Sequence, residues 1–263
     1  MRKTNYLLIL GLIIIVTNAC HTSDTSYITS LVELEFSTVE VHEKFFNESG
    51  DFIEIELRLP KLVGDFAGIP LINEFFAGRL EYFYNEIDVS GNLQMFHEWR
   101  EQGADSNAEI VPIRGLERNW GRVAQYELGS VHGDVISIYA WRWGGMGGVT
   151  WLGKEGHTFD LNTGERLELS DIFSVSEEEY MNLIFDFITQ ELAVDGRLPF
   201  SPFAPYTDPW YEIIRQLDPN NFYITKNSLI IFYWRGTFAP GAGGMYPNIF
   251  EIPLDDIRDI LAI

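Results

Sequence analysis

The chain has 263 residues, and its apolar fraction of 46% and aromatic fraction of 14% suffice to fill a hydrophobic core, which excludes a disordered chain. Its formal net charge of −21 repels phosphate backbones, so we expect no nucleic-acid partner and, if a protein binds, a cationic one. The alternative interpretation of this charge is that it only keeps an exported protein soluble.

The first 20 residues have the order of a bacterial signal peptide. Arg2 and Lys3 precede an apolar run over 6–16, which is shorter than the roughly 20 apolar residues that span a bilayer. Cys20, the one cysteine of the chain, directly follows Ala19, and this segment resembles a lipobox. We therefore expect a lipid-anchored, extracytoplasmic protein of the cell envelope, attached to the membrane through Cys20. The alternative is an ordinary cleaved signal with a chance cysteine.

The next hundred residues predict a tether, two strands and a helix. Residues 21–30 are polar and rich in Ser and Thr, which is typical of a flexible tether. Apolar residues alternate over 31–41 and over 52–59, as in half-buried strands, and Pro60 predicts the end of the second strand. Apolar residues at helical spacing follow over 68–87.

Two hairpins follow in the middle of the chain. The first joins strands at 123–128 and 135–143 through a turn at 132–134. The second joins 151–159 to 165–169 around Asn162-Thr163-Gly164, a strong turn sequence.

The last third predicts two helices and a further pair of strands. Ser176 and Glu179 form a capping box that begins a helix reaching Leu192. Strands are expected at 222–224 and 229–234, and a short helix after Pro253. Because strands and helices come in mixed blocks, we expect an α+β fold with largely antiparallel sheets, helices packed on one face, and two sub-regions of similar size.

Motifs for catalysis are not found in the sequence. It contains no Gly-x-Ser-x-Gly elbow, phosphate loop or dinucleotide fingerprint, and its five histidines show no metal-ligand spacing. We expect His157, on a predicted strand, to be structural. The sequence thus predicts a protein that is not an enzyme and holds no cofactor or metal. An envelope hydrolase with a pair of carboxylates is the alternative, because spacing in sequence cannot exclude such a pair.

Two glycine-rich segments flanked by aromatic residues are the candidate binding elements. Glycine lets the backbone approach a partner closely, and neighbouring aromatic rings offer flat contact area for a sugar or a protein. Alternation along a strand places Trp141 and Trp143 on one face. The alternative is that both segments are tight connections with core tryptophans. The candidate binding residues are Trp141, Arg142, Trp143, Gly145, Met146 and Trp151 in the first segment, and Trp234, Arg235 and Tyr246 in the second.

A family resemblance rests on the same part of the chain. The aromatic strand with its Gly-Gly loop, the stretch 158–173 and the segment 239–244 resemble the RsiV-type extracellular domain family, found in lysozyme-sensing anti-sigma factor ectodomains. The end of the strand at 59–62 and the residues Ile72-Asn73 resemble the accessory domain of PdaC-type peptidoglycan deacetylases. The resemblance implies a PdaC-like α+β region over 31–134 and an RsiV-like α+β region over 135–263. It also implies a binding role outside the membrane, toward lysozyme or the cell wall.

Together these features favour a non-enzymatic envelope lipoprotein that binds or senses a cationic protein such as a lysozyme-type wall hydrolase. The alternative is a lipoprotein that binds peptidoglycan or another carbohydrate through Trp141, Trp143, Trp151 and Trp234.

Overall fold

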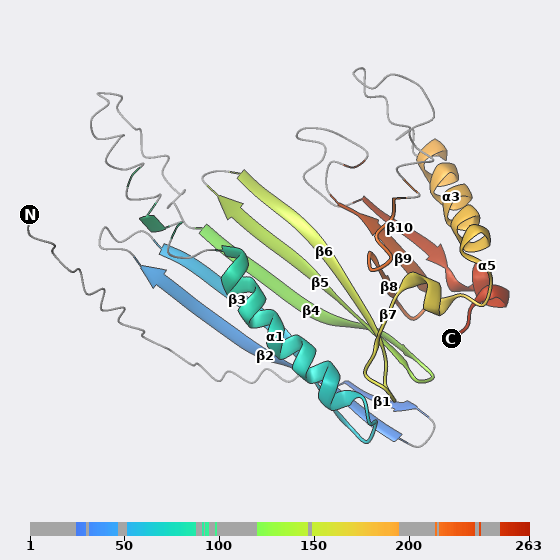
Figure 1. Cartoon of the computed structure of the whole chain (residues 1–263), viewed down its shortest axis with the longest axis horizontal. Helices are drawn as coiled ribbons and strands as arrows, with labels where there is room; N and C mark the ends of the chain where they lie inside the picture. The colour runs from blue at the N-terminus through green and yellow to red at the C-terminus, as the bar shows by residue number, and fades with distance from the viewer. Residues whose placement is uncertain are drawn as a thin grey trace, which may run out of the picture.

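The computed structural model describes residues 25–29, 32–46, 52–87, 120–146, 149–194, 216–234 and 248–263, together with single positions between these ranges. It is a mixed α/β structure made mostly of strands, as the sequence predicts. Figure 1 shows a long curved sheet crossed by one helix, beside a smaller sheet with its own helix.

The larger sheet contains seven strands in the order of the chain, β1-β2-β3-β4-β5-β6-β7. All neighbouring strands are antiparallel except β3 and β4, which run parallel because the connection between them carries a helix back along the sheet. The strands span Thr25–Thr29 (β1), Val32–Phe46 (β2), Phe52–Gly64 (β3), Trp120–His132 (β4), Val135–Met146 (β5), Val149–Asp160 (β6) and Arg166–Leu167 (β7).

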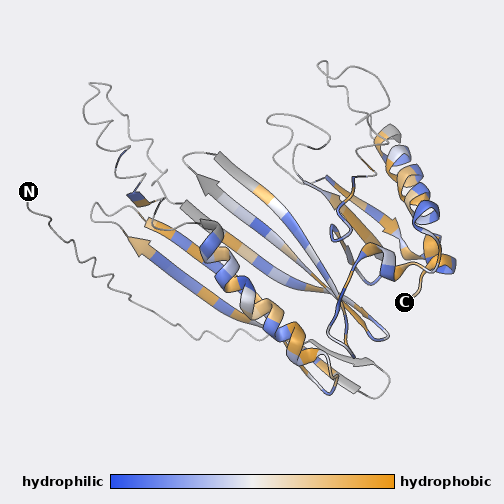
Figure 2. Ribbon diagram, in the orientation of Figure 1, coloured by the Kyte–Doolittle hydropathy of each residue, from blue (hydrophilic) through white to orange (hydrophobic). Residues whose placement is uncertain are grey.

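That helix, α1 (Ile69–Ile87), covers one face of the sheet. Polar and apolar residues alternate along β2 and β3, visible as blue and orange bands in Figure 2, so only one side of each strand is apolar. Ile72, Phe76 and Phe83 from α1 pack against the apolar side, on Ile55 of β3 and Ile138 of β5 among others. We call the opposite side, which carries Trp141 and Trp143, the outer face.

The smaller sheet has three antiparallel strands in the order β10-β9-β8 and a core of its own. The apolar side of α3 contributes Ile184 and Ile188, which pack with Leu229 and Ile231 of β9. The elements of this part are η1 (Leu169–Ile172), α3 (Glu177–Val194), β8 (Phe222–Ile224), β9 (Ser228–Tyr233), β10 (Asn248–Pro253), α5 (Leu254–Ile257) and η3 (Arg258–Ile260).

Strand β8 lies against β4, β5 and β6 and joins the two parts. The Ile224 N–H donates to Ser137 Oγ at 2.8 Å, and Ser130 Oγ donates to the Ile224 carbonyl at 2.8 Å. Gly156 of β6 permits this approach, since a Cβ at this position would lie 1.8 Å from the carbonyl oxygen of Phe222. The boundary expected at 134/135 falls in the turn of the β4–β5 hairpin, so both sub-regions supply strands to the seven-stranded sheet.

The predicted turns are found, with Gly133 and Gly164 at positive φ of 56° and 77°. Two other predictions are wrong. Strand β3 continues through Pro60 to Gly64, because β4 pairs only with Ile53–Arg58 and the missing N–H of proline interrupts no ladder on that side. The expected tether contains β1, which pairs with residues 32–36 of β2, and β10 was not predicted at all.

No helix within the described residues is both long and apolar enough to cross a bilayer. The predicted signal segment and Cys20 lie outside those residues.

The close contact at Gly156 predicts a sharp difference between two glycine substitutions. Gly156→Ala should lower the free energy of unfolding by about 1–3 kcal/mol, because the methyl group must displace backbone of β8. Gly78→Ala is the matched control: nothing lies within 4 Å of its added Cβ on α1, so it should raise stability by about 0.5–1 kcal/mol. Urea unfolding measures both. Equal effects would contradict the tight junction between β6 and β8.

Candidate functional site

Alternation along β5 separates the candidate binding residues onto two faces. Trp141 and Trp143 point to the outer face, where Trp141 is half-buried and Trp143 is 38% exposed. Arg142 points to the opposite side and is only 4% exposed, so it lies in the interior and not on the expected binding surface. Trp234, at the end of β9, is 52% exposed.

Of the remaining candidates, three have a defined position on a strand and two lie outside the described residues. Gly145 and Met146 lie at the end of β5, where Gly145 pairs with Gly121 and Met146 with Val149. Trp151 is part of β6 and pairs with Gly144. The side chains of Met146 and Trp151, and the whole of Arg235 and Tyr246, lie outside the described residues. The structure therefore brings Trp141 and Trp143 together on one surface.

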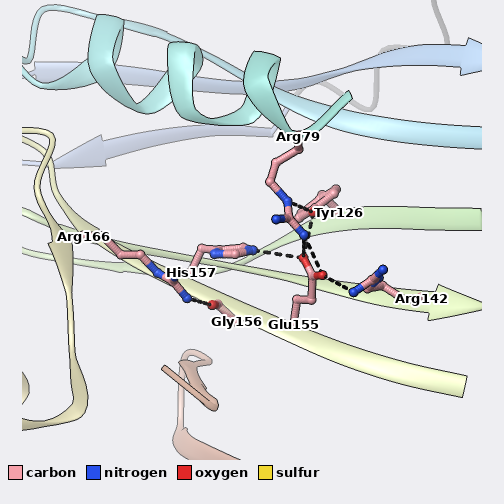
Figure 3. Close-up of polar contacts among 7 residues, drawn as sticks. All are labelled: Arg79, Tyr126, Arg142, Glu155, Gly156, His157 and Arg166. Carbon is pink, nitrogen blue, oxygen red and sulfur yellow. Dashed lines mark hydrogen bonds and ion pairs between the residues drawn. The ribbon is translucent and has the colours of Figure 1, made fainter. Parts of the chain in front are cut away.

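A buried charge network, which the sequence did not predict, surrounds Glu155 of β6 on the side facing α1 (Figure 3). Arg79 Nη2, from α1, donates to both carboxylate oxygens at 2.7 and 2.8 Å. Arg142 Nη1 lies 2.7 Å from Oε1, and the Tyr126 hydroxyl donates to Oε2 at 2.9 Å. His157 Nε2 is 3.2 Å from Oε2. We call these five residues the Glu155 network.

The protonation states in the Glu155 network follow from burial and charge. Burial alone would raise the pKa of Glu155, but the hydrogen bond from His157 and the charges of Arg142 and Arg79 outweigh it and lower the pKa to about 2. Burial lowers the pKa of His157, which keeps the imidazole neutral. Since an ionised carboxylate only accepts, Nε2 carries the hydrogen, and the enclosed Nδ1 is a lone pair without a partner among the described residues.

The Glu155 network has the geometry of a structural clamp. Its carboxylate receives hydrogen bonds or charge from four side chains, so it has little capacity left for a substrate. Arg79 comes from the helix while Glu155 and His157 come from one strand, so the network fastens α1 to the sheet. His157 thus has the structural place that the sequence predicts. Residues alternate between the two faces along β6, so Glu155 and His157 share the inward side and Lys154 and Gly156 the outward side. This alternation was the signal in the sequence that two polar residues point inward.

A second buried charge lies on the outer face of the same strand. Lys154 is 4% exposed, and its Nζ is 3.8 Å from the ring centroid of Trp141, 4.5 Å from that of Tyr139 and 4.7 Å from that of Tyr223. Burial lowers the pKa of Lys154 to about 8, against the opposing effect of Glu127. Lys154 therefore lies directly beside Trp141, one of the aromatic candidates.

Comparison with known proteins connects the smaller sheet with a family. The family model "Protein of unknown function (DUF3298)" matches residues 170–255, which include α3 and the three-stranded sheet. A DUF3298 family member from Bacteroides fragilis has a similar structure, with a TM-score of 0.59 and 15% identity over 88% of this chain and 94% of that one. A DUF3298 family protein from Pseudomonas aeruginosa gives a TM-score of 0.46 and 14% identity over 87% and 94%. No curated protein matches the chain.

The likeness to the Bacteroides protein shows a shared fold that extends over most of both chains. All five residues of the Glu155 network precede the residues matched by the family model, which begin at position 170, after the end of β6 at Asp160. The Trp141–Trp143 surface likewise lies outside the matched residues.

The Glu155 network predicts a large loss of stability when its anion is neutralised. Glu155→Gln removes the carboxylate that pairs with the buried cations Arg79 and Arg142, and should lower the free energy of unfolding by about 3–5 kcal/mol. The control is Arg58→Met in the exposed pair with Glu40, where we expect less than about 1 kcal/mol. Chemical denaturation at neutral pH measures both variants.

Acid titration provides the second arm of this experiment. Because the folded pKa of Glu155 is about 2 and its ordinary value is 4.5, its stabilisation is complete above pH 4.5 and is lost as the pH falls toward 2. Glu155→Gln should lack this part of the acid-induced loss. Identical acid profiles for the variant and the unaltered protein would contradict the assignment.

Proposed function

We propose that this protein is a non-enzymatic extracytoplasmic lipoprotein, anchored through Cys20, that binds or senses a cationic envelope protein such as a lysozyme-type wall hydrolase. The observation that carries the proposal is the distribution of charge in the C-terminal part. Residues 170–194 hold six acidic side chains and no lysine or arginine. All six are exposed: Asp171, Glu177, Glu178, Glu179, Asp186 and Glu191.

The beginning of α3 lies close to a second acidic segment. The Ser174 N–H donates to the Ile260 carbonyl at 2.8 Å, and the Ala262 N–H donates to the Ile172 carbonyl at 2.9 Å. This pairing brings the stretch 255–259, which contains three exposed aspartates, next to the segment that leads into α3. We call residues 171–179 and 255–259 the acidic end. The acidic end contains seven acidic side chains and one arginine, Arg258, which pairs with Asp255. This excess of negative charge attracts a cationic protein and accelerates encounter.

The resemblances noted in the sequence support the same proposal. The region with the RsiV-type resemblance, 135–263, contains all residues that match the DUF3298 family model. The PdaC-type resemblance over 31–134 supports a place near the cell wall. Four features support one setting, the outer side of a bacterial membrane. They are the two resemblances, the lipobox-like segment and the negative charge.

This function predicts saturable binding of a c-type lysozyme that depends on the acidic end. Calorimetric titration of the purified protein at low and at about 0.15 M ionic strength should show 1:1 binding that weakens with salt and persists at the higher value. Replacing Glu177, Glu178 and Glu179 together by glutamine should reduce the affinity about tenfold or more and flatten the salt dependence.

The matched control removes the same charge elsewhere. Glu35, Glu74 and Glu81 are exposed on β2 and α1, and their joint replacement by glutamine should change the affinity only slightly. Equal losses in both triple variants would reduce the interaction to net charge. No heat of binding at low ionic strength would reject lysozyme as the partner.

A second function is favoured by the Trp141–Trp143 surface. The two rings project from one rigid strand to the outer face, at the spacing of about 6.8 Å that separates alternate residues. Aromatic rings held in this way can stack on the apolar faces of sugars. This arrangement supports a peptidoglycan-binding or carbohydrate-binding lipoprotein.

The carbohydrate function predicts binding to insoluble peptidoglycan that salt barely changes, because stacking involves no net charge. Trp143→Ala should reduce co-sedimentation about tenfold, the effect of one lost stacking contact. Phe46→Ala is the control, since Phe46 is 62% exposed on the distant strand β2. Retention of binding in Trp143→Ala would exclude this surface as the glycan site.

A further inference from the structure

The amine of Lys154 is a cation without a counter-ion in the part of the chain that the structure describes. Its contacts are the three ring faces of Tyr139, Trp141 and Tyr223, and no carboxylate lies within ion-pair distance of it there. The amine has no hydrogen-bond partner among the described residues, but it keeps a small contact with solvent. A buried ammonium of this kind is costly unless an anion or a set of π faces compensates it.

Glu127, which acts on Lys154 through its charge, and Glu251, which acts on the neighbouring Tyr223, both have other hydrogen-bond partners. Glu127 of β4, which raises the pKa of Lys154 through its charge, accepts the hydrogen bond of the Tyr139 hydroxyl. Glu251 of β10 accepts a hydrogen bond from Ser228 Oγ at 2.8 Å. Burial, together with the hydrogen bond to Glu127, raises the pKa of Tyr139 to about 12, so this phenol stays neutral beside the amine. Among the described residues, the environment of Lys154 therefore contains aromatic rings and the charge of Glu127, which forms no ion pair with it.

Strand register places this amine at the edge of the Trp141–Trp143 surface. Gln125, Trp141 and Lys154 lie opposite one another on β4, β5 and β6 and form one row across the outer face. Val123, Trp143 and Leu152 form the next row. The amine covers one face of the Trp141 ring, 3.8 Å from its centroid, so a sugar would stack on the opposite face and its carboxylate would reach the amine past the edge of the ring.

We propose that Lys154 binds the carboxylate of an acidic glycan whose sugar rings stack on Trp141 and Trp143. The proposal deepens the carbohydrate-binding function above and rests on it. A ligand carboxylate adds a charge-assisted hydrogen bond to an ammonium that so far has only π contacts. In a chain with a net charge of −21, this enclosed lysine is the local element that selects an anionic sugar over a neutral one.

The test compares two disaccharides that differ by one carboxylate. The purified full chain is titrated with N-acetylglucosaminyl-N-acetylmuramic acid and with N,N′-diacetylchitobiose, and tryptophan fluorescence reports binding. We expect the acidic sugar to bind about tenfold more tightly, the effect of one charge-assisted hydrogen bond. This preference should disappear as the pH rises through about 8, where Lys154 loses its charge, while the affinity for the neutral sugar stays constant.

Lys154→Met should make the two affinities equal, and Lys154→Arg should restore part of the preference. As a readout that does not depend on a variant folding, the Lys154 amine of the unaltered protein is labelled with ¹³C-methyl groups, and its NMR signal should shift with the acidic sugar alone. Equal binding of both sugars, or an unmoved Lys154 signal, overturns the role of Lys154 and leaves glycan binding intact. Binding of neither sugar overturns glycan binding as well.

Discussion

The position of α1 on the sheet depends on the ionised carboxylate of Glu155. Arg79 is separated from Glu155 by 76 positions in the chain, and their hydrogen bonds join the helix to the sixth strand. Arg142, 4% exposed on the neighbouring strand, also forms an ion pair with Glu155. Burying a guanidinium group is unfavourable without a compensating anion, and Glu155 contributes such a charge to both arginines.

Strand alternation gives the two sides of β6 opposite roles. Glu155 and His157 point toward α1 and belong to the clamp, while Lys154 and Gly156 point outward. On the outer side, Gly156 permits the approach of β8 and Lys154 faces the rings of Tyr139, Trp141 and Tyr223. The Glu155 network therefore fixes β6 on the side facing α1, while the outer face of the same strand carries the candidate ligand contacts. A binding surface needs rigid support of this kind.

Local patterns predicted much of the fold because the relevant physics is local. The hairpin turn at Gly133 and the turn at Gly164 need positive φ, which glycine supplies, and both were found from the sequence. The strand end predicted at Pro60 was wrong because the effect of a proline depends on whether a neighbouring strand needs its N–H group. That need is a property of the sheet and not of the local sequence. Strand β1 was missed because a short polar edge strand lacks the alternation of a half-buried one.

The site was predictable only in part, for a different reason. That Trp141 and Trp143 share a face follows from the two-residue period of a strand, so their common surface could be foreseen. The same period places Arg142 on the other face, but only the arrangement of α1 shows that this face is buried. The ion pair of Arg79 with Glu155 joins residues far apart in sequence, and no spacing rule identifies such a partner. Charge patterns along the chain thus indicate surfaces well, whereas the burial of a charge becomes visible only when distant elements meet.

The two proposed functions use different parts of one molecule and different physics. The acidic end lies on the part built around the smaller sheet, where exposed carboxylates act over a distance comparable to the Debye length. The Trp141–Trp143 surface lies on the larger sheet, where contact requires close fit and the only charge proposed to act is that of Lys154. A cationic wall hydrolase and a wall glycan are found together wherever such an enzyme works, so the two surfaces are compatible. Because β8 fixes the smaller sheet against β4, β5 and β6, a partner bound at one surface is held at a defined distance from the other.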